Sequence, residues 1–379
     1  MKKLAVVTLY DDINIGNKLQ NYAVQQFFSN MGFDVYTIPH WEMAHQKFSI
    51  SILKKWFVEI TGMPHERAKK IKLERKRKKK FKAFSDKYLN LGTMVKMKEI
   101  SEDLSKKYDY FVTGSDQVWH NWTKSSQEID YFFLRFANMY QRLSIAPSFG
   151  KERIEDQFIE RYKEGLEGIP FITCREKQGA EIIWKLTQKK ALVILDPTML
   201  ISTDEWIRIE KKPKAYTDEK YILVYFLGSA SENMRMFIKK ISQKYKLKVV
   251  DIYNTKVDYL YSTTPDEFIY YIRHAEFVVT DSFHATVFSI LFKRNFAVFD
   301  RKTESMGNMT SRLDTLLEKF DLLDRKYKNL DFTNLFMANF SKVNIILETE
   351  RKKTYEYYLD VFAKLDDMKV KNQEGESLK

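Results

Sequence analysis

The chain has 379 residues, of which 44% are hydrophobic and 30% are charged, so it can bury a substantial core and is expected to be globular. Its length favours two domains with a cleft between them. The net charge of +13 suits nucleic acid, an anionic membrane or small anionic ligands, whereas the single cysteine, Cys174, excludes an internal disulfide and a multi-cysteine metal site and fits a reducing compartment.

The first 38 residues predict a strand, a helix and a second strand, which together begin a parallel α/β unit. Residues 4–9 are β-rich, residues 18–31 carry apolar side chains at helical spacing, and a second β-rich run spans 33–38. The N-terminal apolar run is short and ends in acidic residues, so we interpret it as a strand and not as a signal peptide. No stretch reaches the roughly 18 apolar residues of a membrane span. We therefore expect a cytoplasmic protein.

A basic insert then interrupts the α/β pattern at about residues 45–90. Within it, residues 67–80 (RAKKIKLERKRKKK) hold ten Lys or Arg side chains against the single Glu74. This run predicts a helix that is either solvated or attracted to anionic lipid headgroups, each basic residue adding about 1 kcal/mol near such a surface. Nucleic-acid binding usually requires aromatic side chains among the basic ones, and here they lie outside the run, so we expect no nucleic-acid partner.

The α/β pattern resumes after the insert and then repeats. The first lobe is completed by strands expected at 108–113, 143–146, 171–173 and 192–195, with helices at 154–166 and 175–186. A turn at Asp196 ends it, and residues 206–217 read as a polar connector. The second lobe has strands expected at 221–227, 248–253, 277–280 and 296–299, with helices at 232–245, 265–275 and 284–292. The predicted organisation is a lobe at 1–196 that contains the insert, a lobe at 197–325, and C-terminal helices with a frayed tail at 326–379.

Polar side chains at the ends of the expected strands are the candidate ligand-binding residues. In open α/β sheets, ligands bind outside the carboxyl ends of the strands, where helix N-termini offer free N–H groups. The candidates are Asp11, Asn14, Gly16 and Asn17 after the first strand; Gly114, Ser115, Asp116 and Gln117 after the third; Arg175 and Glu176; and Asp281, Ser282 and His284.

Three of these candidates could carry chemistry. His284 stands between a buried strand and an apolar helix, where it is either a core histidine or an acid–base or anion-binding group facing the cleft. Asp116 either caps the next helix or faces the ligand, and both roles can coexist. Arg175 begins a helix, where a cation opposes the helix dipole and requires a compensating anion. That anion is Glu176 or Glu181 in a structural account, and a bound phosphate or carboxylate in a functional one.

Several kinds of site are excluded by motifs that the sequence lacks. There is no G-x-G-x-x-G, no P-loop and no H-E-x-x-H, and the other histidines have no partner at ligand spacing, so we predict no zinc or other metal. The absence of any Asp-x-Asp pair argues against sugar transfer from a metal-held nucleotide diphosphate. Trp119 and Trp122, near Asp116, either stack on a sugar ring or belong to the core.

Five segments resemble the polysaccharide pyruvyl transferase family. They are NIGNKLQNYAVQQ at 14–26, YDYFVTGSDQVW at 108–119, ITCREKQGAEII at 172–183, DPTML at 196–200 and FVVTDSFHATVFSILF at 277–292. The resemblance spans about 300 residues, and the last segment is the most specific. It implies two Rossmann-like lobes of the glycosyltransferase-B type, in agreement with the repeated α/β pattern.

The resemblance also implies transfer of a pyruvyl group from phosphoenolpyruvate to two hydroxyls of a glycan, forming a cyclic ketal. Phosphoenolpyruvate is then a substrate, and no cofactor is expected. A histidine and arginines serve the donor in the family, and they map to His284 and Arg175. Some members carry Arg where this chain has Ser282, so the missing donor-binding charge would come from Arg312, Arg301 or Lys302.

The resemblance leads to the following role assignments. We expect His284 to be the proton donor or phosphate ligand, Arg175 a clamp on carboxylate or phosphate, and Asp116 the base for the acceptor hydroxyl. The expected substrate-binding residues are Asn17, Asn21, Gly114, Ser115, Ser282 and Arg312. The acceptor that the resemblance implies is a saccharide, either free or lipid-linked at the inner face of an anionic membrane. The alternative function is a nucleotide-sugar-dependent glycosyltransferase on the same two-lobed scaffold.

Overall fold

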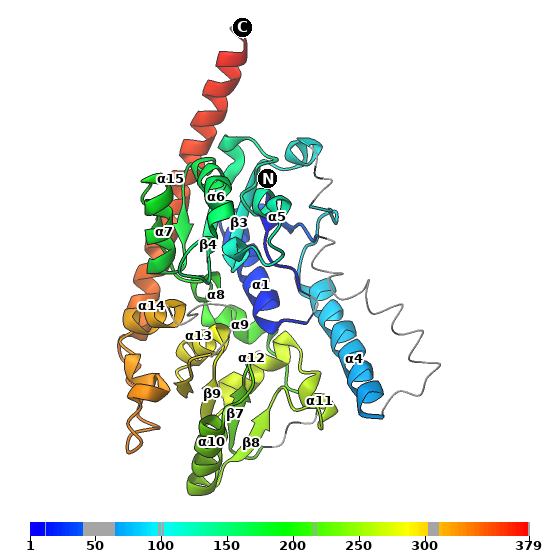
Figure 1. Ribbon diagram of the computed structural model, residues 1–379, viewed down its shortest axis with the longest axis vertical. Helices are drawn as coiled ribbons and strands as arrows, with labels where there is room; N and C mark the ends of the chain where they lie inside the picture. Colours follow the sequence, from blue (N-terminus) through cyan, green and yellow to red (C-terminus); the bar gives the residue numbers. More distant parts are fainter. Residues whose placement is uncertain are drawn as a thin grey trace.

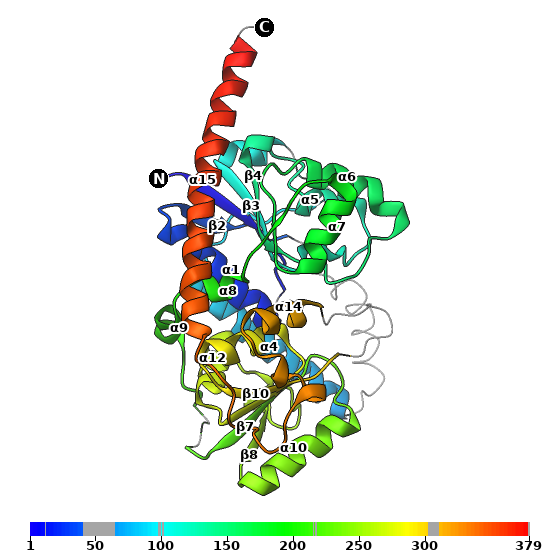
Figure 2. The same ribbon diagram turned by 90° about the vertical axis from the view of Figure 1, so that its left-hand side faces the viewer.

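The chain folds into two lobes, each built on a parallel β-sheet (Figure 1). The computed structural model describes residues 1–11, 13–40, 65–97, 100, 102–214, 216, 218–301 and 311–377. The two lobes lie one above the other, and the C-terminal helix runs back along the first (Figure 2). The expected α/β architecture of two lobes, each built on a parallel sheet, is confirmed.

The N-terminal lobe contains a four-stranded sheet in the order β2-β1-β3-β4. Its strands are β1 (Lys3–Val7), β2 (Asp34–Thr37), β3 (Tyr110–Asp116) and β4 (Arg142–Pro147), followed by a short pair, β5 (Thr173–Cys174) and β6 (Leu192–Val193). Hydrogen bonds between Ser144 and Thr173 connect β4 to β5. The helices of this lobe are α1 (Ile15–Asn30), α5 (Ser126–Phe132), α6 (Ile159–Glu167) and α7 (Lys177–Thr187), with 3-10 turns at Glu102–Lys107, Val118–His120, Met139–Gln141 and Asp156–Phe158.

The C-terminal lobe repeats this plan with a sheet in the order β10-β9-β7-β8. Its strands are β7 (Tyr221–Tyr225), β8 (Lys248–Asp251), β9 (Phe277–Thr280) and β10 (Asn295–Val298). Its helices are α10 (Glu232–Tyr245), α11 (Asp258–Tyr261), α12 (Pro265–His274), α13 (Phe283–Leu291) and α14 (Ser311–Lys319), with 3-10 turns at Leu323–Arg325 and Tyr327–Asn329. All the pairings in both sheets are parallel, so the carboxyl ends of the strands in each sheet meet at one edge.

One apolar core joins the two lobes. Along β1, Leu4 and Val6 point into this shared core, whereas Ala5 and Val7 point into a separate core on the other face of the sheet. Helix α1 packs against α8 (Pro197–Leu200) and against α12 of the other lobe, and α8 also contacts α13. Because the shared core is continuous, the facing edges of the two sheets are held in a fixed relation.

The segment between the lobes differs from the sequence expectation. Residues 206–217 were expected to form a polar connector, but the chain is helical over α9 (Thr203–Ile209). Trp206 is fully buried, and its Nε1 donates a hydrogen bond to the Thr198 carbonyl at 3.0 Å. The sequence did not predict this contact, because one buried tryptophan among charged residues produces no periodic pattern of apolar side chains.

The C-terminal helix α15 (Val343–Ser377) packs against the N-terminal lobe (Figure 2). The Tyr358 hydroxyl donates to the Ser144 carbonyl at 2.6 Å, Arg351 Nε donates to the Met199 carbonyl at 2.8 Å, and Lys2 pairs with Asp366 at 2.6 Å. The segment that leads into β1 and the C-terminal helix therefore contact each other in the same lobe.

The basic insert contributes α4 (His65–Tyr88), and residues 45–64 lie outside the described part of the chain. Arg77 on the inner face is 1% exposed. Its Nη1 donates to the Tyr261 carbonyl at 2.5 Å, and its Nε and Nη2 donate to the Ile13 carbonyl at 3.2 and 3.0 Å. Lys80 donates to the Ser262 carbonyl at 3.1 Å. Part of the basic run therefore ties the first loop of the N-terminal lobe to the C-terminal lobe.

We predict that Arg77→Met lowers the free energy of unfolding by about 3 kcal/mol, because charge-assisted hydrogen bonds to two buried carbonyls are lost. Chemical denaturation of the full chain measures the change. Arg75→Met is the matched control on the same helix, and since Arg75 is exposed it should change stability by less than about 0.5 kcal/mol. Equal stability of the two variants would contradict the tie between the lobes.

Candidate active site

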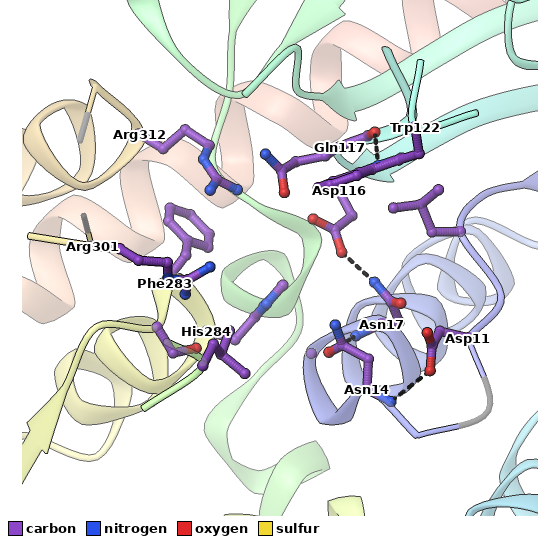
Figure 3. Close-up of a pocket in the computed structure, with 14 residues that line it drawn as sticks. Asp11, Asn14, Asn17, Asp116, Gln117, Trp122, Phe283, His284, Arg301 and Arg312 are labelled. Atoms are coloured by element: carbon purple, nitrogen blue, oxygen red, sulfur yellow. Dashed lines mark hydrogen bonds between the residues drawn. The ribbon is translucent and has the colours of Figure 1, made fainter. Parts of the chain in front are cut away.

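A cavity of about 400 Å³ lies between the carboxyl ends of the two sheets (Figure 3). The N-terminal lobe lines it with Leu9, Asp11, Asn14, Gly16, Asn17, Asp116, Gln117 and Trp122, and the rest of the lining is Leu227, Ser282, Phe283, His284, Arg301 and Arg312. The expectation that ligands bind at the carboxyl ends of the strands was therefore correct for each sheet. That expectation did not distinguish the side chains that reach the cavity from those that lie behind its wall.

His284 reaches the cavity from the first turn of α13. Ser282 caps this helix by accepting a hydrogen bond from Ala285 N at 3.4 Å. The imidazole packs so closely on Gly16 of α1 that a Cβ there would lie 2.3 Å from His284 Nδ1. Only glycine at position 16 leaves room for the ring, so the contact between the lobes depends on both residues.

The environment of His284 keeps its imidazole neutral near pH 7. Burial lowers the pKa of His284; the Asp196 and Asp116 carboxylates oppose this effect, while Arg175 and Arg312 reinforce it. The Nε2 atom lies 3.9 Å from Asp196 Oδ2 and has no hydrogen-bond partner among the described residues. The Nε2 atom itself is buried on the Asp196 side, while the residue lines the cavity, where a neutral imidazole can take up or deliver a proton.

Asp196 is buried behind the cavity, and the sequence analysis took it for a turn within the segment at 196–200 and not for a site residue. Its Oδ1 accepts hydrogen bonds from Thr198 N and Oγ1 at 3.0 and 2.7 Å. Its Oδ2 accepts from Arg175 Nη1 at 2.8 Å and from Ser115 Oγ at 2.9 Å. Burial would raise its pKa, but His284, Arg175 and these hydrogen bonds lower the pKa of Asp196 to about 2. Its signal in the sequence was the position directly after the last strand of the lobe.

Arg175 lies behind the cavity and not in its wall, which corrects the expectation of a direct clamp. Its side chain is 2% exposed, and its Nη1 and Nη2 pair with Asp196 at 2.8 Å and with Asp116 at 3.4 Å. The compensating anions are thus Asp196 and Asp116 of the same lobe, with a smaller contribution from Glu176. Arg175 acts on the site by positioning Asp116 and Asp196.

Asp116 does line the cavity, at the last position of β3. Its φ of 72° is in the left-handed region, which turns its side chain out of the strand register. Besides the pair with Arg175, Asp116 Oδ2 accepts a hydrogen bond from Asn17 Nδ2 (Figure 3). The following short helix is capped by Gln117, so Asp116 is not its N-cap.

Three expected substrate-binding residues are buried behind the wall. Asn21 is fully buried and accepts a hydrogen bond from Thr37 Oγ1. Gly114 has a φ of 116°, and a Cβ there would lie 2.2 Å from the Ile145 carbonyl oxygen, so this glycine serves strand packing. The Ser115 hydroxyl is directed to Asp196. Asn17, Ser282 and Arg312 do line the cavity.

Two arginines face the cavity beside Ser282 (Figure 3). Arg301 is paired with Asp281 at 3.1 Å. Arg312, on α14, is 8% exposed and makes no hydrogen bond or ion pair with any described residue. Burial and then the neighbouring Arg175 lower the pKa of Arg312 to about 10, which leaves it charged at pH 7. Lys302, the third candidate, lies outside the described residues.

The two tryptophans expected near the site differ in position. Trp119 is 1% exposed and packs between Phe133 and Phe149, so it belongs to the core and cannot stack on a sugar. Trp122 lines the cavity, with His120 stacked on it at 4.0 Å. Among the residues that the structure describes, no three His, Cys, Asp or Glu side chains gather as a metal site would require.

A comparison with family models agrees with the resemblance read from the sequence. A family model for polysaccharide pyruvyl transferase matches residues 14–303, a range that includes Asn17, Asp116, His284 and Arg301 and ends before Arg312. Curated proteins gave no significant match. The UDP-GlcNAc 2-epimerase of Neisseria meningitidis bound to UDP-GlcNAc aligns at 10% identity and a TM-score of 0.49, covering 96% of this chain and 100% of that one. MurG of Acinetobacter baumannii aligns at 10% identity and a TM-score of 0.43, with coverages of 96% and 100%.

We predict that Asp196→Asn destabilises the protein by about 3 kcal/mol at pH 7, because it leaves buried Arg175 short of a counter-charge. The folded-state pKa of Asp196 is below its usual value of 3.8, so its stabilising effect is present above pH 3.8 and is lost as the pH falls toward 2. Urea unfolding of both proteins at pH 7 and pH 3 should therefore show a smaller difference at pH 3. Asp218→Asn, at an exposed position, is the control. If Asp196→Asn lost no more free energy of unfolding than this control, the role of Asp196 would be contradicted.

Proposed function

Because the chain belongs to the polysaccharide pyruvyl transferase family, we propose that it moves a pyruvyl group from phosphoenolpyruvate to two hydroxyls of one saccharide, forming a cyclic ketal in glycan biosynthesis. The observation that carries this proposal is Arg312, a buried guanidinium at the cavity wall with no anionic partner among the described residues. A buried charge without a partner is costly, so such a group is typical of a site that binds an anion.

The donor fits the wall formed by Arg301, Arg312 and His284. Phosphoenolpyruvate carries a phosphate and a carboxylate, and guanidinium groups bind such oxygens through two parallel hydrogen bonds. Arg312 would supply the charge that some family members place at the position of Ser282. Since Arg301 already neutralises Asp281, Arg312 brings the larger uncompensated charge.

The proposed reaction needs one proton carrier and one base. The first acceptor hydroxyl adds to C2 of phosphoenolpyruvate while C3 takes up a proton; the second hydroxyl then closes the ketal as the C–O bond to phosphate breaks. Overall, one hydroxyl proton ends on the methyl carbon and the other on inorganic phosphate. A bound dianion would offset Arg175 and Arg312 and let His284 take up the proton that it delivers to C3. Asp116 would accept the hydroxyl proton, held in place by Asn17 and Arg175.

We predict that phosphoenolpyruvate raises the melting temperature of the protein, and that Arg312→Met reduces donor affinity at least tenfold, about 1.4 kcal/mol. The unliganded variant should melt at the same temperature or higher, because a buried cation is replaced by an apolar side chain of similar length. Differential scanning fluorimetry, with phosphate release in the presence of a saccharide panel, measures both effects.

The control for Arg312→Met is Arg235→Met on the exposed face of α10, which should change neither quantity. Stabilisation by a nucleotide diphosphate and not by phosphoenolpyruvate would support the glycosyltransferase alternative. An Arg312→Met variant that binds phosphoenolpyruvate as tightly as the wild type would remove the main support for the donor site.

We further propose that the enzyme works at the cytoplasmic membrane surface on a lipid-linked acceptor. No helix in the described ranges has the length and hydropathy of a membrane span. Lys72, Arg75 and Lys79 form an exposed stripe on the outer face of α4 and make no ion pair with another described residue. Arg77 and Lys80 face inward, whereas the outer stripe is available to anionic headgroups.

We predict that replacing Lys72, Arg75 and Lys79 with Gln weakens binding to vesicles containing phosphatidylserine by at least tenfold, at about 1 kcal/mol per charge, without lowering the melting temperature. Vesicle co-sedimentation measures the binding. The matched control replaces Lys239, Lys240 and Lys244 on the exposed face of α10, which should leave binding unchanged. An equal loss in both triple variants would indicate attraction by net charge alone.

A further inference from the structure

The two walls of the cavity carry different kinds of polar group (Figure 3). The wall opposite the N-terminal lobe presents Arg301, Arg312 and His284. The N-terminal wall presents two carboxylates, three side-chain amides and one indole: Asp11, Asp116, Asn14, Asn17, Gln117 and Trp122. None of the described lining residues on the N-terminal side is Lys or Arg. Asp116 is paired with Arg175 behind this wall, so the uncompensated negative charge of the N-terminal wall is that of Asp11, and an anion is favoured at the opposite wall.

Trp122 is held in a fixed orientation before any ligand binds. Its Nε1 donates to the Gln117 carbonyl at 3.0 Å, and its backbone N donates to Glu128 Oε1 at 2.9 Å. Glu128 is 1% exposed, and its other oxygen accepts from Thr123 N at 2.6 Å. The ring of His120 stacks on the indole at 4.0 Å and 17°, and burial lowers the pKa of His120 to about 3, so the stack is uncharged. A buried carboxylate and a neutral imidazole thus anchor a rigid aromatic group at the cavity wall.

The polar groups of the same wall are also fixed by local bonds. Asp11 Oδ1 accepts from Ile13 N at 2.6 Å and from Asn14 N at 3.0 Å, and Asn14 in turn accepts from Asn17 N at 3.2 Å. Arg77 holds the Ile13 carbonyl from behind, so this loop is tied to α4 as well. Carboxylates and amides held in this way can bond neighbouring hydroxyls of a polyol without a further ordering cost.

We propose that the N-terminal wall is the acceptor subsite and that it takes an uncharged pyranose, with Trp122 against the face of the ring and Asp11, Asn14 and Asp116 bonded to hydroxyls. This inference rests on the proposed function. It adds the position and charge of the reacting sugar. Any phosphate of a lipid-linked or nucleotide-linked acceptor lies away from this wall, because Asp11 repels it and the arginines of the opposite wall attract it.

The test measures sugar binding without the donor. Ligand-observed NMR with the full chain would compare the methyl glycosides of glucose, galactose, mannose and N-acetylglucosamine with the 6-phosphates of the same sugars. We expect at least one neutral glycoside to bind and its 6-phosphate to bind at least tenfold more weakly. Trp122→Ala should weaken the neutral glycoside at least tenfold, and Trp122→Phe should retain most of the binding.

Two controls separate a sugar contact from a structural role. Trp184→Ala removes a tryptophan that is 45% exposed on α7, away from the cavity lining, and should leave glycoside binding unchanged. Trp122→Ala should keep the rise in melting temperature caused by phosphoenolpyruvate, since the donor wall is intact.

The outcomes distinguish this inference from the proposed function. If glycoside binding requires Trp122 but phosphoenolpyruvate does not stabilise the protein, the acceptor subsite is supported and phosphoenolpyruvate is rejected as the donor. A 6-phosphate that binds as tightly as the neutral glycoside, unchanged binding in Trp122→Ala, or no binding by any neutral glycoside overturns the subsite even if phosphoenolpyruvate binds.

Discussion

The geometry of the cavity depends on one buried carboxylate, Asp196. It accepts hydrogen bonds from Thr198, Ser115 and Arg175, and His284 of the opposite lobe approaches it to 3.9 Å. Removing a carboxylate and a guanidinium from water costs several kcal/mol for each ion, so such a pair persists only when its partners are complete. This cluster therefore couples two properties of the molecule: how the lobes face each other, and how Asp116 is oriented at the cavity wall.

The sequence allowed the fold and half of the site to be predicted. There is a physical reason why the other half could not be predicted. Parallel strands share one carboxyl edge, so polar residues after strands had to converge, and Asn17, Asp116 and His284 did. The distance of a side chain from that edge cannot be predicted from the sequence pattern. Asn21 shares a face of α1 with Asn17 but lies one turn, about 6 Å, deeper in the lobe. Arg175 has the expected place in the chain, yet two carboxylates from separate segments hold it behind the wall.

The basic run shows a second limit of prediction from composition. Ten cations in fourteen residues predicted a charged helix correctly, but composition does not assign the faces of a helix. Arg77 points inward to backbone carbonyls of both lobes, whereas Arg75 two positions earlier is exposed. The inward contacts bring together segments distant in sequence, Ile13 and Tyr261, and no local pattern signals such a contact.

The docking of α15 has a consequence for how the protein is made. Tyr110 of β3 and Phe362 of α15 pack ring to ring at 4.9 Å, although 252 residues separate them in the chain. At about 5–20 residues per second, a ribosome takes roughly 13–50 s to synthesise the intervening segment. During this interval the aromatic surface of the nascent N-terminal lobe is uncovered. The N-terminal lobe is thus completed only after the C-terminal lobe has been synthesised, and its aromatic surface is open to chaperones and to aggregation until α15 has left the exit tunnel.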